Sequence, residues 1–224
     1  FAHGQVAVAS DQADDRIPSI CFGADPQTLN NDYQYQYSID YVSEGRTILD
    51  YIIRDWWDTK GMTSPVKVGF LGAAGYQTAD QYWEGFQAAA AAQPNKCDLT
   101  RQVAPTTQTA WASEVNALKN CDVIVVGTVG PAVGTFLKEL TLRGYQGSVL
   151  GTTISILSAW TIVTGLVPKA ELDGVVLPHA WHVWTDDNPF VANMKAGLGK
   201  YRSTEAQRLQ EGTTWLTGWT LAYI

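Results

Sequence analysis

Residues 67–74 read KVGFLGAA, residues 98–104 read DLTRQVA and residues 121–128 read CDVIVVGT. Each of these runs is short, apolar and typical of a buried strand. Amphipathic segments lie between them and predict helices over residues 78–92 and 109–119. Strands separated by helices of this length cannot form hairpins, so they cross over and lie parallel. The sequence therefore predicts an α/β fold, with helices packed on a parallel sheet.

Small-residue loops follow the strands of this predicted sheet. A further helix is expected over residues 131–143, and a last strand over residues 148–150. In open parallel sheets, small molecules bind beyond the carboxyl ends of the strands. These ends correspond to residues 73–76, 127–131 and 151–153, which offer hydroxyl, backbone and aromatic groups. We expect a ligand site there.

The composition of the chain excludes several classes of function. Hydrophobic residues make up 46% and charged residues 17%, which is ordinary for a globular protein. The net charge of -7, with no cluster of Lys and Arg, argues against a nucleic-acid partner. No apolar stretch of about 18 residues predicts a span across a bilayer. Nine Trp and ten Tyr residues are many for this length. Most are expected to pack in the core or the hinge, and the excess favours recognition of apolar or planar ligands.

The segments outside the central layer are interpreted as parts of a second lobe. Their patterns, together with the helix that opens the central layer, predict helices over residues 6–15, 42–57, 189–201 and 213–224, and strands over residues 17–22, 33–39 and 174–178. Residues 38–178 could form a complete layered domain, whereas residues 1–37 and 179–224 supply too few strands for a sheet. We therefore interpret the chain as an internal fragment. It begins at Phe1, so a targeting signal cannot be observed.

No catalytic or metal-binding constellation is evident in the sequence. The serine residues stand in no GxSxG elbow, and no histidine has the surroundings of a catalytic triad. The loop at 127–131 lacks the third glycine of a dinucleotide fingerprint. His3, His179 and His182 lack neighbouring thiolates or carboxylates at ligand spacing. We expect neither an enzyme nor a cofactor; a small α/β enzyme would need a catalytic residue that the sequence does not offer.

Two of the three cysteines raise the question of a disulfide. Cys97 and Cys121 both stand at the start of a predicted strand. If these strands are neighbours, their first residues lie about 5 Å apart, which is within the range of a disulfide. A Cys97–Cys121 bond is therefore one expectation, and two free thiols in a reducing compartment are the alternative.

Five motifs in a fixed order resemble those of the bilobal substrate-binding proteins of ABC importers, of the branched-chain amino-acid-binding type. They extend over nearly the whole chain and are residues 17–29 (IPSICFGADPQTL), 33–37 (YQYQY) with Gly45 and Arg46, 68–84, 122–137 and 144–153. Each motif alone is weak, whereas their order and spacing are a strong signal.

The resemblance implies a periplasmic-binding-protein type I fold with two Rossmann-like lobes, the N-terminal one incomplete. Residues 38–178 would be the C-terminal lobe, and residues 1–37 and 179–224 part of the N-terminal lobe. Hinge crossings would lie near residues 35–39 and 177–181. The implied function is capture of a small organic solute and its delivery to a membrane permease, without chemistry. The implied location is periplasmic or extracellular, a cell-surface lipoprotein included.

The resemblance also implies a set of ligand contacts from both lobes. The positions that match are Gln5 (beside His3 and Gly4), Gly23, Ala24, Asp25, Tyr76, Val129, Thr153 and Trp181. Tyr76 is the best single candidate, because it follows a strand in a glycine-containing loop and has no obvious role in a core.

Departures from the family pattern bear on the identity of the ligand. Thr153 stands where amino-acid binders carry an acidic residue, and Val129 stands where an aromatic residue is frequent. Asp25 would repel a ligand carboxylate. We therefore expect a ligand with a donor-rich or cationic group toward Asp25 and a planar or apolar part against Tyr76 and Trp181. A ligand-sensing receptor domain, or a scaffold with an empty cleft, is the alternative function.

Overall fold

The computed structural model describes residues 9–16, 18–21, 32–36, 39–156, 160–178, 187, 189–201 and 203–204. The chain divides into two compact units, Phe1–Pro178 and His179–Ile224. The division falls inside residues 177–181, the range expected for the second hinge crossing. How the chain divides between two lobes stays a prediction.

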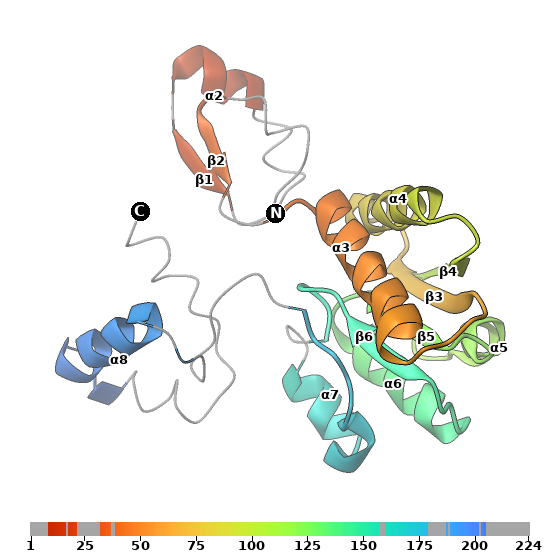
Figure 1. The fold of residues 1–224 in the computed structure, drawn as a ribbon. Coiled ribbons are helices and arrows are strands. Elements are labelled where there is room, and N and C mark those ends of the chain that lie inside the picture. Colours follow the sequence, from red (N-terminus) through yellow and green to blue (C-terminus); the bar gives the residue numbers. More distant parts are fainter. Residues whose placement is uncertain are drawn as a thin grey trace. The chain divides into compact units, whose positions relative to one another are not determined.

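A four-stranded parallel sheet forms the centre of the first unit (Figure 1). Its strands are β3 (Val66–Ala73), β4 (Cys97–Ala104), β5 (Val123–Gly127) and β6 (Ser148–Gly151). All pairings are parallel, and the order across the sheet is β4-β3-β5-β6. The predicted parallel sheet is thus confirmed. The strand expected over residues 174–178 is reduced to a single bridge, between Leu150 and Val176.

Helices cover both faces of this sheet (Figure 1). They are α3 (Tyr41–Arg54), α4 (Gln77–Ala92), α5 (Ala112–Leu118), α6 (Pro131–Leu142) and α7 (Trp160–Leu166). The first two pack on one face and the other three on the opposite face. The last turn of the helix expected over residues 42–57 is a π-helix, Asp55–Thr59. Neither α7 nor the 3-10 helix Lys169–Leu172 was predicted.

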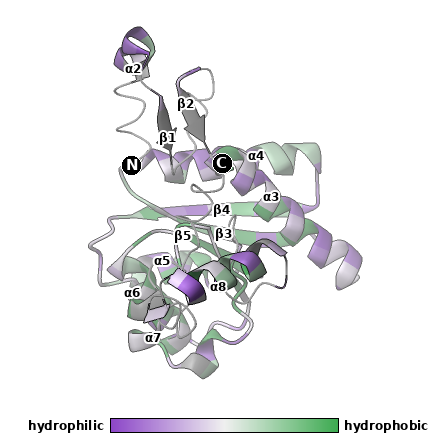
Figure 2. Cartoon of the chain, turned by 90° about the vertical axis from the view of Figure 1, so that its left-hand side faces the viewer, coloured by the Kyte–Doolittle hydropathy of each residue, from purple (hydrophilic) through white to green (hydrophobic). Residues whose placement is uncertain are grey.

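Alternating side chains of the central strands supply the two cores. In Figure 2, the green of hydrophobic residues runs along the central strands. Ile124 and Val126 belong to the core under α5, α6 and α7, whereas Val123 and Val125 belong to the core under α3 and α4. The period of two that directs neighbouring strand residues to opposite faces explains this division. Both faces of the sheet are therefore buried, as all-parallel sheets require.

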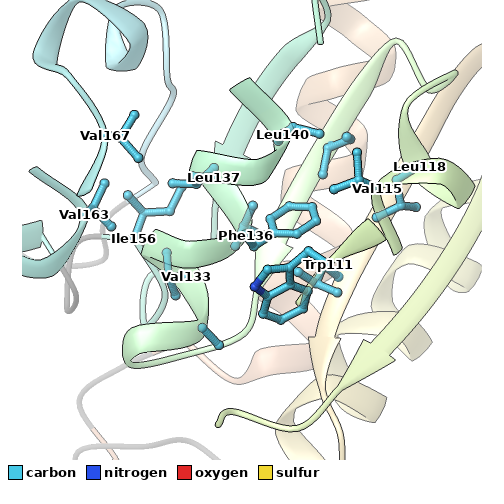
Figure 3. Close-up of a cluster of buried hydrophobic side chains, with 14 of the residues drawn as sticks. Trp111, Val115, Leu118, Val133, Phe136, Leu137, Leu140, Ile156, Val163 and Val167 are labelled. Atoms are coloured by element: carbon cyan, nitrogen blue, oxygen red, sulfur yellow. The ribbon is translucent and has the colours of Figure 1, made fainter. Parts of the chain in front are cut away.

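An aromatic pair lies in the middle of the core under α5, α6 and α7. The rings of Trp111 and Phe136 meet edge to face, with their centroids 5.3 Å apart. Figure 3 shows apolar side chains of these helices pointing toward one another around this pair. The Trp111 indole N–H donates to the Thr135 hydroxyl at 2.9 Å, so burial of the ring leaves no polar atom without a partner.

The opposite core depends on a very close approach of α3 and α4. A Cβ built on Gly45 would lie 2.5 Å from the carbonyl oxygen of Tyr82. A Cβ built on Gly85 would clash with the Val42 carbonyl oxygen and lie 2.7 Å from the amide nitrogen of Arg46. These obstacles are backbone atoms that cannot turn away. The two glycines therefore set the distance between the helices.

The terminal elements follow the sequence pattern where the structure describes them. They are α2 (Ala9–Asp15), β1 (Ser19–Cys21), β2 (Gln34–Gln36) and α8 (Pro189–Tyr201). Strands β1 and β2 pair in parallel, with Ile20 opposite Tyr35. The helix expected over residues 213–224 lies outside the described residues.

The expected disulfide between Cys97 and Cys121 is wrong, because both cysteines are free. Strand β3 lies between β4 and β5, so their first residues are two strand spacings apart. Two spacings amount to about 10 Å, which exceeds the reach of a disulfide. Cys121 belongs to the core under α5, α6 and α7, whereas Cys97 packs against the core on the other face.

Candidate functional site

The strand order points to one edge of the sheet as a candidate ligand site. The chain leaves β3 to form β4 on one side, and then crosses to form β5 on the other side of β3. The direction of winding therefore changes between β3 and β5. In open α/β sheets, ligands bind at such a switch point, beyond the carboxyl ends of the strands. Tyr76 and Val129 follow these two strands, and Thr153 follows β6 at the same edge.

Tyr76 is presented to solvent at this edge. Its side chain is 45% exposed, which is unusual for a large ring beside a buried strand. Gly75, which precedes Tyr76, has a φ of 77°, a left-handed conformation that glycine adopts at no steric cost. The residue then caps α4 without a side-chain hydrogen bond. The phenol ring is therefore available for contact with a ligand.

Val129 is half-buried in the loop between β5 and α6. Gly130 follows with φ of 67°, and Pro131 opens the helix, where a missing amide hydrogen costs nothing. Before it, the hydroxyl of Thr128 is buried and has no hydrogen-bond partner among the described residues. Buried hydroxyl groups are normally paired, so Thr128 marks this loop as a place where a further polar group fits.

Thr153 is brought to the same edge but is itself buried, with 3% of its surface exposed. It lies in a tight turn in which the Ser155 hydroxyl accepts from the Thr152 amide at 2.7 Å and donates to the Thr152 carbonyl at 3.0 Å. Its own amide and hydroxyl both donate to one carboxylate oxygen of Glu44, at 2.7 and 2.6 Å. The donors of Thr153 are thus occupied within the protein.

Glu44 is a residue of this edge that the sequence analysis missed. It lies in the first turn of α3, is 5% exposed, and also accepts a hydrogen bond from the Tyr82 hydroxyl at 2.8 Å. Burial raises its pKa above the ordinary value of 4.5, against the hydrogen bonds from Thr153 and Tyr82, which lower it. A signal was present in the sequence: Glu44 falls on the apolar stripe of α3 with Tyr41 and Ile48.

The remaining predicted contacts lie outside the described residues. They are Gln5 with His3 and Gly4, Gly23, Ala24, Asp25 and Trp181. Within the part of the chain that the structure describes, no cluster of three or more His, Cys, Asp or Glu residues could hold a metal ion. No helix among the described residues is long and apolar enough to cross a membrane.

A model of the periplasmic binding protein family matches residues 3–222 of the chain. Comparison with curated protein sequences gives no match. A branched-chain amino-acid ABC transporter protein from Thermus thermophilus, with bound valine, has a similar fold, with a TM-score of 0.70 at 16% sequence identity over 90% of this chain and 51% of that one.

Two further solved structures are similar to the chain. A fatty-acid ABC transporter substrate-binding protein from Thermomonospora curvata has a TM-score of 0.70 and 17% identity, over 88% of this chain and 49% of that one. A branched-chain amino-acid transporter substrate-binding protein from Streptococcus pneumoniae, in complex with isoleucine, has a TM-score of 0.67 and 14% identity, over 88% and 54%. The chain therefore spans about half the length of these proteins.

Proposed function

The chain belongs to the periplasmic binding protein family, and we propose that it captures a small organic solute between two lobes and delivers it to an ABC permease. Residues 38–178 would form the C-terminal lobe, and residues 1–37 with 179–224 part of the N-terminal lobe. Closure about crossings near residues 35–39 and 177–181 would be stabilised by a solute that touches both lobes. The protein would act outside the cytoplasm and perform no chemical step.

One observation carries this proposal: an exposed tyrosine stands at the switch point of a parallel sheet. Tyr76 is 45% exposed directly after β3, and the loop with Val129 follows the neighbouring strand. An aromatic ring exposed at the edge where α/β sheets bind ligands is more readily explained by a ligand than by packing.

The candidate contacts suggest a solute with an apolar or planar part and a hydrogen-bond donor. Tyr76 would pack against the apolar part, together with Val129 and with Trp181, which would lie at the second hinge crossing. Asp25 would face the donor or cation. The similar structures were solved with valine or isoleucine, or are described for fatty acids. These ligands share an apolar part, to which the contacts expected in this chain would add a donor. An amino acid, an amide or a related compound is therefore the class to test first.

A thermal-shift screen of the full-length protein tests this function. The panel contains amino acids, short amides, polyamines, aromatic acids, fatty acids and sugars. A ligand present at a hundred times its Kd stabilises the native state by about 2.7 kcal/mol, so a dose-dependent rise in Tm for one chemical class is expected. A folded protein that responds to no member of the panel would contradict solute capture and favour a receptor domain or a scaffold.

Two variants locate the site once a solute is found. Tyr76→Ala is expected to weaken the affinity by roughly 5- to 150-fold, because an aromatic contact of this kind contributes about 1–3 kcal/mol. Tyr51→Ala is the matched control, since Tyr51 on α3 is 40% exposed but lies away from the carboxyl ends of the strands. An equal loss of affinity in both variants would exclude the switch-point edge as the site.

A further inference from the structure

Glu44 is a buried carboxylate in a helix face that is otherwise apolar. Its neighbours on the buried side of α3 include Tyr41, Ile48 and Leu49. Burial of an ionised carboxylate without partners is costly, so its presence needs a reason. Packing gives none, because an apolar side chain of the same size would fill this position at lower cost.

Three donors from two other elements converge on this carboxylate. The amide and hydroxyl of Thr153 donate to one oxygen at 2.7 and 2.6 Å, and the hydroxyl of Tyr82 donates to the other at 2.8 Å. Thr153 is 109 residues away in sequence and Tyr82 is 38 residues away. Glu44 therefore connects α3, α4 and the turn after β6, and that turn is part of the candidate ligand edge.

The direction of these hydrogen bonds fixes what Thr153 can offer to a ligand. Its hydroxyl donates its one proton to Glu44, so the hydroxyl oxygen can only accept a hydrogen bond from any other group. Its amide donates to the same carboxylate oxygen. A group that meets the Thr153 hydroxyl would therefore have to donate a hydrogen bond. Protonation of Glu44 would replace the charge-assisted hydrogen bonds from Thr153 with weaker neutral ones, because the protonated carboxyl keeps only its carbonyl oxygen as a good acceptor.

The surroundings of Glu44 raise its pKa above that of an ordinary carboxyl group. Burial raises its pKa most, the charge of Asp40 adds to the rise, and the three hydrogen bonds oppose it. The titratable groups that act on it are Asp40 on its own helix and Tyr82 on α4, whose own pKa is raised well above 10.0 by burial and by Glu44. Tyr41 packs on Tyr82, with ring centroids 5.4 Å apart. The turn after β6 contributes only hydroxyl and amide groups to this cluster.

We propose that Glu44 is a positioning residue of the solute site: it holds the turn of Thr153 at the carboxyl end of β6, and uptake of a proton by Glu44 loosens that turn. This inference rests on the proposed function, because it takes the carboxyl edge of the sheet as the ligand site. The hydrogen bonds between Glu44 and Thr153 are present without a ligand. The test of this inference can therefore succeed or fail whether or not a solute is found.

Hydrogen exchange of the Thr153 amide in the ligand-free full-length protein tests the proposal. The loss of a hydrogen bond to a charged group corresponds to roughly a ten- to hundredfold change in an opening equilibrium. We therefore expect Glu44→Ala to lower the protection of the Thr153 amide by at least tenfold, relative to the Val125 amide in β5. Glu44→Gln keeps one acceptor oxygen and should restore part of this protection.

Glu84→Gln is the matched control, because it removes the same charge from an exposed position of α4. It should leave the Thr153 amide unchanged. Protection of Thr153 in the native protein should also fall, relative to Val125, as the pH is lowered through the pKa of Glu44, and this fall should be absent in Glu44→Gln. Equal losses at Thr153 and Val125 would reveal a merely structural role and overturn the proposal, as would unchanged protection of Thr153 in Glu44→Ala.

Discussion

The two faces of the central sheet are built on different principles. The face under α5, α6 and α7 is filled by apolar side chains around the Trp111–Phe136 pair. The face under α3 and α4 combines two glycines at a backbone contact with a buried carboxylate that hydrogen-bonds to Thr153 at the candidate ligand edge. The first face provides stability through area buried from water. The second face connects helices α3 and α4 to the candidate site. We therefore expect mutations on the first face to change stability, and mutations on the second face to change the candidate site as well.

The largest effect is expected on the apolar face. Phe136→Ala should lower the free energy of unfolding by about 3–5 kcal/mol, because it leaves a cavity in a fully buried cluster. Urea denaturation measures the change. Leu142→Ala on the same helix is the control, since Leu142 is 70% exposed and should cost little. Similar costs for both variants would show that this face is not packed as described.

A smaller but distinctive effect is expected where α3 and α4 touch. Gly85→Ala should destabilise the protein by about 1–3 kcal/mol or more, because the added methyl group meets the backbone of Val42 and Arg46. Gly165→Ala in α7 meets nothing within 4 Å and should stabilise by about 0.5–1 kcal/mol, owing to the better helix propensity of alanine. Thermal unfolding of both variants compares the two faces directly. A neutral Gly85→Ala would contradict the close helix contact.

The buried carboxylate should give the α3–α4 face a pH dependence. The pKa of Glu44 is raised in the folded protein, so the folded state holds this proton more tightly than the unfolded state does. The contribution of Glu44 to stability is therefore fully present below about pH 4.5 and is lost as the pH rises through the folded pKa. Glu44→Gln should remove this loss.

Urea denaturation between pH 4 and pH 8 measures this component as the difference between the native protein and Glu44→Gln. Phe136→Leu, which removes no titrating group, should leave the pH profile in place. A difference that stays constant with pH would mean that Glu44 does not titrate in this window.

The smallest effect is expected from reduction of the protein. Cys97 and Cys121 are free and pack on opposite faces of the sheet, so a reductant should leave the Tm unchanged. Loss of a native disulfide would instead cost about 2–5 kcal/mol. Thiol titration of Cys97→Ser and Cys121→Ser variants in denaturant, each with one reactive group fewer than the native chain, would identify the free thiols. A Tm that falls on addition of reductant in the native protein, but not in either variant, would show that the two cysteines form a disulfide after all.

The local sequence pattern was sufficient to predict most strands and helices of the central sheet and its two covering layers. The apolar runs that became β3 and β5, and the helix that became α6, were predicted to within two residues, because each pattern reflects burial on its own element. The disulfide was wrong because strand order decides which starts are adjacent, and the order is a property of the whole sheet. The strand around Val176 shrank to a single bridge, although its composition is typical of a strand.

The candidate site was less predictable than the frame. Tyr76 could be singled out because its position after a strand is visible in the sequence. The partnership of Glu44 and Thr153 could not, because 109 residues separate them and no spacing rule relates a helix start to a distant turn. Glu44 was detectable only as a charge on an apolar stripe. Interpreted in that way, it would have pointed to a buried polar connection but not to its partner.

A crystal structure of the full-length protein with the solute from the screen would locate the binding site. We expect the solute at the carboxyl ends of β3, β5 and β6, with its apolar part against Tyr76 and a donor near Thr153. A solute bound elsewhere, with Tyr76 still exposed to solvent, would contradict this expectation.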